Sequence, residues 1–236
     1  MATETMPPKE RVRAGLWGLP TDRVPLHCRL RMAPLTPEYQ WVRDLGWAVV
    51  GGHPGFIVTH LDVRSQWRDE IHDGRHCRRQ VLHTSRGTLT SLETRNAAGG
   101  QMILEHLFKS ETDYPALLAL IRSTRCEPAY DEFRASAASL GNWGYAYSWA
   151  GFDPMHEIMI NLMGIEGFSL EWMDHQENVL ELYQALLDRH RDMFRIVADG
   201  PAEFVCYGGN ISPTLVGRPR FERYYCRFKK GCVIFP

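Results

Sequence analysis

Hydrophobic and polar positions follow two different periods along this chain. From Leu26 to Met32 they alternate with period two, so that His27, Arg29 and Arg31 are polar while the residues between them are apolar or cysteine. This alternation predicts a β-strand with one polar face, because successive side chains of a strand point to opposite sides. Two apolar runs bounded by glycine and proline, 47–50 and 56–61, predict two more short strands.

The middle of the chain predicts a small antiparallel meander. Three segments of extended character lie between residues 78 and 108, and Arg86-Gly87 and residues 97–100 separate them. Helical spacing dominates afterwards. Helices are predicted at 11–18, 111–122, 130–140, 154–163, 176–198 and 219–225, and strands at 144–150 and 204–207. Strands that alternate with helices indicate βαβ units and a parallel sheet, here in one domain over residues 1–236.

Composition places the chain among ordinary folded proteins. It has 44% hydrophobic and 23% charged residues, with 27 basic side chains against 28 acidic ones. A net charge of -1 provides no general attraction to nucleic acid. The longest uncharged stretch, 45–60, is interrupted by glycine and proline, so no membrane segment is predicted. An N-terminus without an apolar core and six scattered cysteines indicate a cytoplasmic protein with reduced thiols.

The polar face of the first strand is the most unusual local feature. Two cations and an imidazole need anionic partners if they are enclosed, and a carboxylate-rich ligand would meet that need. The alternative is an edge strand whose polar face is solvated. His27, Arg29 and Arg31 are therefore candidate binding residues.

Three other segments carry candidate chemistry. IHDGRHC holds the possible metal ligands His72, His76 and Cys77 among arginines, which favours a loop, and no metal is predicted. YAYSWAGFDP, 145–154, ends a predicted strand with aromatic residues that either bind a ligand or pack in a core. YGGNISP, 207–213, is a glycine turn that offers Asn210 to a ligand, or a plain turn. GxGxxG, P-loop, GxSxG and HExxH motifs do not occur.

Taken in order, four segments resemble the uroporphyrinogen decarboxylase superfamily, which includes the heme-pathway decarboxylase and corrinoid-linked methyltransferases. RVRAGLWGLPTDRVPL, 11–26, resembles its opening helix, Asp-Arg-x-Pro turn and first strand. HTSRGTLT, 83–90, is similar to its Thr-Pro-x-Gly-x-Leu segment, with Ser85 in place of proline. WAGFDP through NLMGIEGF, 149–168, resembles the Gly-Pro-Phe turn and the later Met-Gly-x-Glu that the family carries around its middle strand. Residues 199–225 resemble its strand, glycine turn and Pro-x-x-Phe-x-x-Tyr helix.

The resemblance implies a (β/α)8 TIM barrel with its site at the C-terminal strand ends. We expect the barrel to be incomplete, because the recognisable pattern stops at Tyr225, and the meander near 78–108 to be an insertion. The implied activity removes carboxylate groups as CO2 from a tetrapyrrole-type polycarboxylate in porphyrin and heme biosynthesis, without a cofactor. An acidic group there stabilises the protonated pyrrole.

The resemblance also implies roles for individual residues. Asp62 is the candidate catalytic acid. The candidate substrate-binding residues, with Arg29 and Arg31 as carboxylate clamps, are His27, Arg29, Arg31, Tyr147, Phe152 and Asn210. The expected partner is a small anionic molecule, with a homodimer as a further option.

Two alternatives stay open. The first is a corrinoid-linked methyltransferase, although Cys226 and Cys232 do not fit its zinc-ligand pattern. The second is a non-catalytic binding relic of the barrel. Separately, the expected truncation would remove part of the decarboxylase site and its activity. Measuring CO2 release beside ligand binding separates a decarboxylase from a binding protein.

Overall fold

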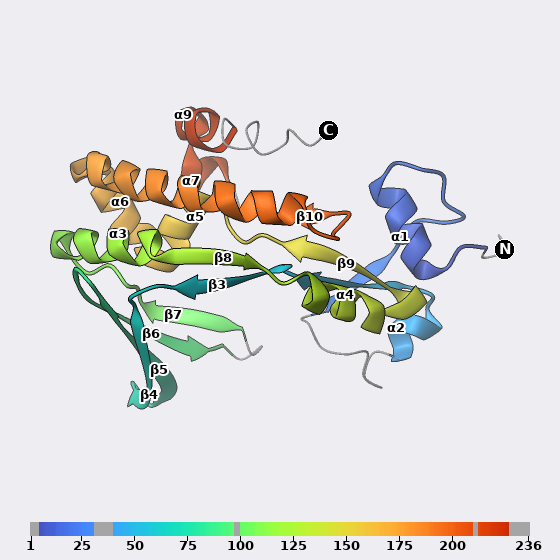
Figure 1. Ribbon diagram of the computed structural model, residues 1–236, viewed down its shortest axis with the longest axis horizontal. Helices are drawn as coiled ribbons and strands as arrows, with labels where there is room; N and C mark the ends of the chain where they lie inside the picture. Colours follow the sequence, from blue (N-terminus) through green and yellow to red (C-terminus); the bar gives the residue numbers. More distant parts are fainter. Residues whose placement is uncertain (1–4, 31–39, 97–99, 210–211, 227–236) are drawn as a thin grey trace. The chain divides into compact units, whose positions relative to one another are not determined.

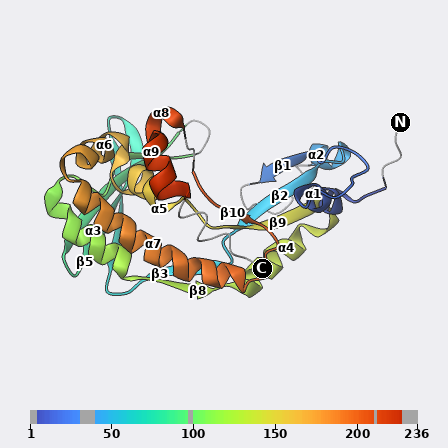
Figure 2. The same cartoon turned by 90° about the horizontal axis from the view of Figure 1, so that it is seen from above.

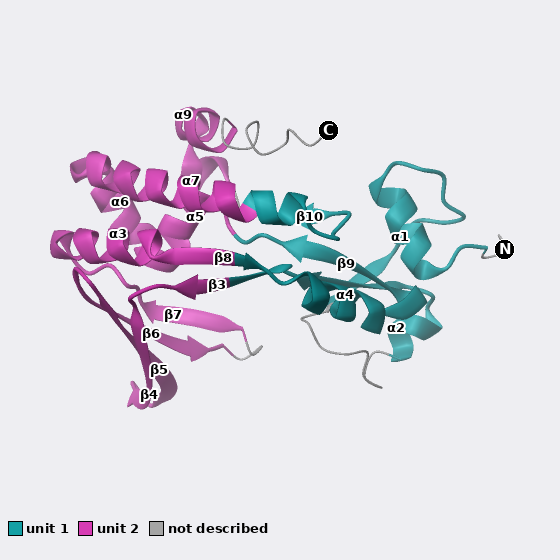
Figure 3. Ribbon diagram, viewed as in Figure 1, with its two compact units in different colours: residues 1–57, 127–151, 194–207 teal, residues 58–126, 152–193, 208–236 magenta. Residues whose placement is uncertain are grey.

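The structure, a computed structural model, describes residues 5–30, 40–96, 100–209 and 212–226 (Figure 1). The predictions for Arg31 and Asn210 lie outside these residues. The chain divides into two compact units: unit 1 is 1–57, 127–151 and 194–207, and unit 2 is 58–126, 152–193 and 208–236 (Figure 3). At three of the positions where the chain passes from one unit to the other, the boundary falls inside a helix or a strand rather than in a linker. The single domain therefore stays a prediction.

Unit 1 is built on a parallel sheet. Its strands are β1 (His27–Leu30), β2 (Ala48–His53), β9 (Gly144–Trp149) and β10 (Val205–Cys206), in the order β1-β2-β9-β10, and all neighbours run parallel. The prediction of an α/β protein with parallel strands is confirmed. No sheet of the described residues closes on itself, and the TIM barrel stays a prediction.

Helices cover both faces of this sheet. On one face, α1 (Pro8–Leu16) packs Val12 against Ala48 and Tyr145. On the other, α2 (Gln40–Asp44) and the end of α4 (Tyr130–Ser139) pack Val42 and Leu140 against Val49. The short 3-10 turn Gly141–Trp143 joins α4 to β9. Figure 1 shows α1 above the strands of this sheet and α4 below them, and in the view from above in Figure 2 α1 overlaps the strands.

The segment resembling the family's opening holds unit 1 together. Arg11 is 2% exposed, and its Nε and Nη2 donate to the two carboxylate oxygens of Asp22 over 2.6 and 3.0 Å. The same Nη2 donates to the carbonyl of Met6 over 2.7 Å, while the backbone N–H of Met6 donates to Asp22. The hydrogen bond from Arg11 holds the pKa of Asp22 far below its ordinary value. Asp22 is therefore a structural anchor.

Unit 2 contains an antiparallel sheet of β4 (Arg64–His72), β5 (Arg75–Thr84), β6 (Gly87–Arg95) and β7 (Gln101–Glu105). The predicted meander is confirmed, with β4 as an additional strand. IHDGRHC is a hairpin rather than a loop, because Asp73 and Gly74 both have positive φ angles, 50° and 73°, and form the tight turn that Asp-Gly favours.

The rest of unit 2 is mostly helical. Its elements are the 3-10 turn Glu111–Asp113, α3 (Tyr114–Arg122), α5 (Pro154–Glu157), the π-helical turn Ile158–Leu162, α6 (Gly164–Asp174), most of α7 (Gln176–Ala198), α8 (Pro213–Val216), α9 (Arg218–Arg220) and the π-helical turn Phe221–Cys226. Strands β3 (Phe56–His60) and β8 (Thr124–Pro128) pair with each other, and each strand is divided between the two units. The predicted bounds of α7 are confirmed, whereas α6 was not predicted, because Gly164 marks a helix end and a new helix begins there.

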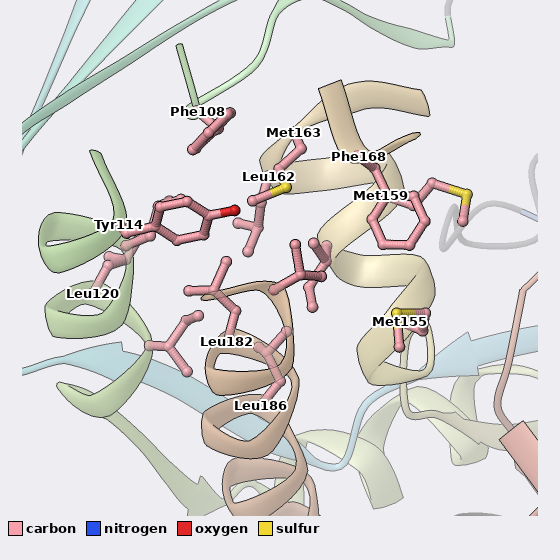
Figure 4. Close-up of a cluster of buried hydrophobic side chains, with 14 of the residues drawn as sticks. Phe108, Tyr114, Leu120, Met155, Met159, Leu162, Met163, Phe168, Leu182 and Leu186 are labelled. Carbon is pink, nitrogen blue, oxygen red and sulfur yellow. The ribbon is translucent and has the colours of Figure 1, made fainter. Parts of the chain in front are cut away.

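One apolar core joins the elements of unit 2. Leu117 of α3, Phe168 of α6 and Leu182 of α7 are fully buried in it, and Figure 4 shows their helices converging. Leu82 and Leu89, which face each other on β5 and β6, bring the antiparallel sheet into the same core. None of the described helices is long and apolar enough to cross a membrane.

Candidate functional site

The strand register brings several predicted binding residues onto one face of the unit 1 sheet. Arg29 lies beside Val50, Val50 beside Tyr145, and Gly52 beside Tyr147. Paired neighbours share a face, so His27, Arg29, Tyr147 and Trp149 point to the same side, and we call these four the Arg29 face. Cys28 points the other way and packs against the buried cluster there. The predicted alternation is confirmed, and β1 is an edge strand whose His27 and Arg29 are exposed.

Arg29 lies over aromatic rings. Its guanidinium carbon is 5.2 Å from the ring centroid of Trp149 and 5.8 Å from that of Tyr147, which is the range of cation–π contacts. Tyr147 is buried, whereas Arg29 is exposed. Within the described part of the chain, no carboxylate pairs with Arg29. The rings lie toward the C-terminal end of β9, the side on which parallel sheets bind ligands.

Gly52 positions the phenol of Tyr147. A Cβ atom at Gly52 would lie 2.9 Å from both Cζ and Oη of Tyr147, too close for any side chain. On its other side, the ring of Tyr147 meets Phe204 edge to face at 6.4 Å. The second glycine of AVVGGH therefore leaves the room that the ring of Tyr147 occupies near Arg29.

Asp62 and Phe152 belong to unit 2, whereas His27, Arg29 and Tyr147 belong to unit 1. Asp62 is exposed in the turn after β3 and lines a cavity of about 560 Å³ with Ser85 and Arg86 of the HTSRGTLT segment. Arg122 and Arg125 line it too, and sequence reasoning missed both, because nothing local links them to Asp62. Phe152 lies 6.3 Å from the ring of His156.

A buried acid–base pair begins α5. Asp153 caps the helix by accepting the backbone N–H of His156 over 3.0 Å, and both side chains are 2% exposed. The Nδ1 of His156 lies 3.3 Å from the second carboxylate oxygen of Asp153. A Cβ atom at Gly209 would lie 2.5 Å from Cδ2 of His156, so only glycine fits there. His156 and Gly209, from two segments of the resemblance (149–168 and 199–225), thus meet in unit 2.

A second buried polar cluster is built around Glu157, the residue after His156. Glu157 accepts a hydrogen bond from Arg189, and Nε2 of His190 lies 3.3 Å from the same oxygen. Burial acts to raise the pKa of Glu157, but the hydrogen bond from His190 and the charge of Arg189 outweigh it and lower the pKa. Burial also lowers the pKa of His190, which is 1% exposed. Glu157 is therefore ionised and His190 neutral at pH 7.

The sequence does carry a signal for His190, which the prediction overlooked. It lies four residues after Leu186 and three before Met193, in the middle of the apolar stripe of α7. A polar residue in such a stripe is buried and needs a partner. Glu157 is that partner.

The hairpin register separates the three possible metal ligands of IHDGRHC. His72 pairs with Arg75 and Cys77 with Glu70, so both lie on one face, while His76 pairs with Ile71 on the other. Among the residues that the structure describes, no group of three or more His, Cys, Asp or Glu side chains is placed to hold a metal ion.

Comparison of the chain with protein-family models, curated proteins and solved structures finds no match. The resemblance to the uroporphyrinogen decarboxylase superfamily therefore rests on the four sequence segments alone.

Proposed function

We propose that this chain binds an anionic, ring-containing small molecule on the Arg29 face and releases carboxyl groups from it as CO2. The observation that carries the proposal is the guanidinium of Arg29, which lies over Tyr147 and Trp149 with no carboxylate partner among the described residues. An exposed guanidinium in this setting is available for a charge-assisted, bidentate bond to a carboxylate. The resemblance supplies the substrate class, a tetrapyrrole-type polycarboxylate.

The carboxylates of such a ligand match the polar side chains of the Arg29 face, and its pyrrole rings match the aromatic ones. Arg29 donates two N–H groups to one carboxylate, and His27 on the same strand face offers a further donor. The partly exposed ring of Trp149 gives a pyrrole ring a surface on which to pack. The glycine at position 52 keeps Tyr147 in place beneath the cation.

Decarboxylation also requires a proton on the ring. Protonation of a pyrrole carbon gives the electron pair of the breaking C–C bond a place to go as CO2 leaves. A second proton then takes the place of the lost carboxyl group, and the first proton leaves the ring carbon, which restores the pyrrole. A carboxylate near the protonated ring stabilises its positive charge. The resemblance implies Asp62 for this role; Asp62 belongs to unit 2, whereas the Arg29 face belongs to unit 1.

The test measures binding and CO2 release on the same samples. With uroporphyrinogen as ligand, Arg29→Gln should weaken binding roughly 10- to 150-fold, since a charge-assisted contact contributes about 1.5–3 kcal/mol. Asp62→Asn should abolish CO2 release and leave affinity nearly unchanged. Arg134→Gln is the matched control, because Arg134 is an exposed arginine of unit 1 whose one partner among the described residues is Asp131. Equal affinity of the wild type and Arg29→Gln would refute the binding site.

The second candidate function is binding of the same ligand without release of CO2. The observation that favours it is that Arg29 and Asp62 belong to different compact units. In the same assay this candidate predicts binding that depends on Arg29, with no CO2 released by any variant.

A further inference from the structure

The cavity around Asp62 has the composition of a binding site of its own. It lies wholly within unit 2, and its volume of about 560 Å³ is typical of small-molecule sites. Apolar side chains line part of it, among them Leu61, Pro115 and Leu118. Three arginines, Arg86, Arg122 and Arg125, line it against the single carboxylate of Asp62. The charged lining therefore carries a net positive charge.

Two of the three arginines have no carboxylate partner among the residues that the structure describes. Arg125 donates to the backbone carbonyl of Thr124 over 3.0 Å, and no acidic side chain is paired with Arg86. Arg122 is paired with Glu181 over 2.9 Å. Because like charges repel, cations that share a cavity favour the binding of an anion.

Hydrogen bonds hold the backbone segments that carry these groups. Thr84 accepts the backbone N–H of Arg86 over 3.1 Å and donates to the carbonyl of Gly87 over 2.9 Å, which fixes the turn between β5 and β6. The N–H of Leu61 donates to the carbonyl of Ser123 over 2.9 Å, which ties the turn of Asp62 to the segment that leads to Arg125. The backbone of the lining is thus held in place before any ligand binds, while the side chains of Arg86, Arg122 and Arg125 are exposed.

Asp62 adds selectivity to the cavity. Its φ angle of 58° lies in the left-handed region, which aspartate and asparagine tolerate better than most residues. Within the described residues its carboxylate forms no hydrogen bond or ion pair. A ligand that is only an anion is repelled by this group, whereas a ligand with an added ammonium group is attracted to it.

We propose that this cavity binds a small organic dicarboxylate that also carries an ammonium group. The arginines hold the carboxylates, Asp62 holds the ammonium, and the methylene chain packs on Leu61, Pro115 and Leu118. The proposal shares Asp62 with the proposed function, but its test measures binding and needs no CO2 release, so either proposal can fail alone.

Three probes dissect the cavity: L-glutamate has both carboxylates and the ammonium, glutarate lacks the ammonium, and 4-aminobutyrate lacks one carboxylate. Binding to the full chain is measured by titration calorimetry or ligand-observed NMR. Glutamate should bind most tightly. Arg86→Gln and Arg125→Gln should each weaken its binding by about tenfold or more, whereas Arg134→Gln, in unit 1, should leave it unchanged.

Asp62→Asn gives the sharpest result, because asparagine keeps the left-handed turn and removes only the charge. It should weaken glutamate binding and strengthen glutarate binding, and damage to the fold cannot produce these opposite changes. Two results would overturn the proposal. One is the absence of saturable glutamate binding at millimolar concentration, and the other is a change of the same sign for both ligands in Asp62→Asn.

Discussion

Units 1 and 2 are stabilised in different ways. In unit 1 a parallel sheet carries small buried clusters on its two faces, such as Val42, Val49 and Leu140. In unit 2 a single core takes side chains from helices and from two strands of the antiparallel sheet. The polar groups differ accordingly, because the Arg29 face stays open on an edge strand, whereas Glu157 and His190 satisfy each other inside unit 2. Exposed polar side chains on an edge strand can bond to water, whereas a buried charged group costs free energy unless it is paired.

Matched core truncations should show the largest difference between the units. Leu182→Ala removes a fully buried side chain from the core of unit 2, and we expect a loss near the top of the roughly 2–5 kcal/mol range for such changes. Leu140→Ala removes the same atoms from the small cluster of unit 1, where neighbours have more freedom to close the gap, and should cost near the bottom of that range. Urea unfolding measures both. Equal losses would contradict the proposed difference in packing.

Matched glycine substitutions should have intermediate effects. At Gly209 an added Cβ meets the buried imidazole of His156 at 2.5 Å, and at Gly52 it meets Tyr147 at 2.9 Å. Overpacking of this kind costs about 1–3 kcal/mol, and Gly209→Ala should be the worse, because its contact is closer. Gly52→Ala should also weaken ligand binding to the Arg29 face, since Tyr147 must move. Unchanged binding in a folded Gly52→Ala protein would show that Tyr147 does not shape that face.

Acid should weaken the two units in different pH ranges, with the smallest effects of the three comparisons. Burial lowers the pKa of His60, His106 and His190, all in unit 2. Below about pH 6.5 these histidines bind protons in the unfolded chain but stay neutral in the folded protein. The free energy of unfolding of unit 2 therefore falls as pH falls through that value. In unit 1 the hydrogen bond from Arg11 lowers the pKa of Asp22, so this stabilisation is present at neutral pH and is lost only below about pH 4.

Hydrogen exchange at each pH, expressed as protection factors, resolves the two units. Protection should fall first in peptides of unit 2, between about pH 6.5 and 5, and later in peptides of unit 1. In Asp22→Asn the loss below about pH 4 should flatten, because no carboxylate remains there to take up a proton. Simultaneous loss in both units at every pH would contradict the separate origins of the two effects.

Short-range periodicity was sufficient for much of the fold. The helix over 176–198 and the strand face of His27 and Arg29 follow from spacing alone, because neighbours along the chain decide both. The Asp73-Gly74 hairpin follows from the same kind of argument, because Asp-Gly favours a tight turn between two strands. The prediction of a loop at this segment was wrong. Strand β8 was not predictable in this way, since Thr124–Pro128 has no apolar alternation.

By itself, the sequence determined which residues lie on which face of a strand or helix, since that depends only on local backbone geometry. It placed His27 and Arg29 together, and it put His190 within an apolar stripe. Only the tertiary structure decided that Trp149 lies under Arg29, that Glu157 meets His190, and that Asp62 shares a cavity with Arg122 and Arg125. These pairs are far apart in sequence, and no local period encodes a contact that forms only when separate elements pack.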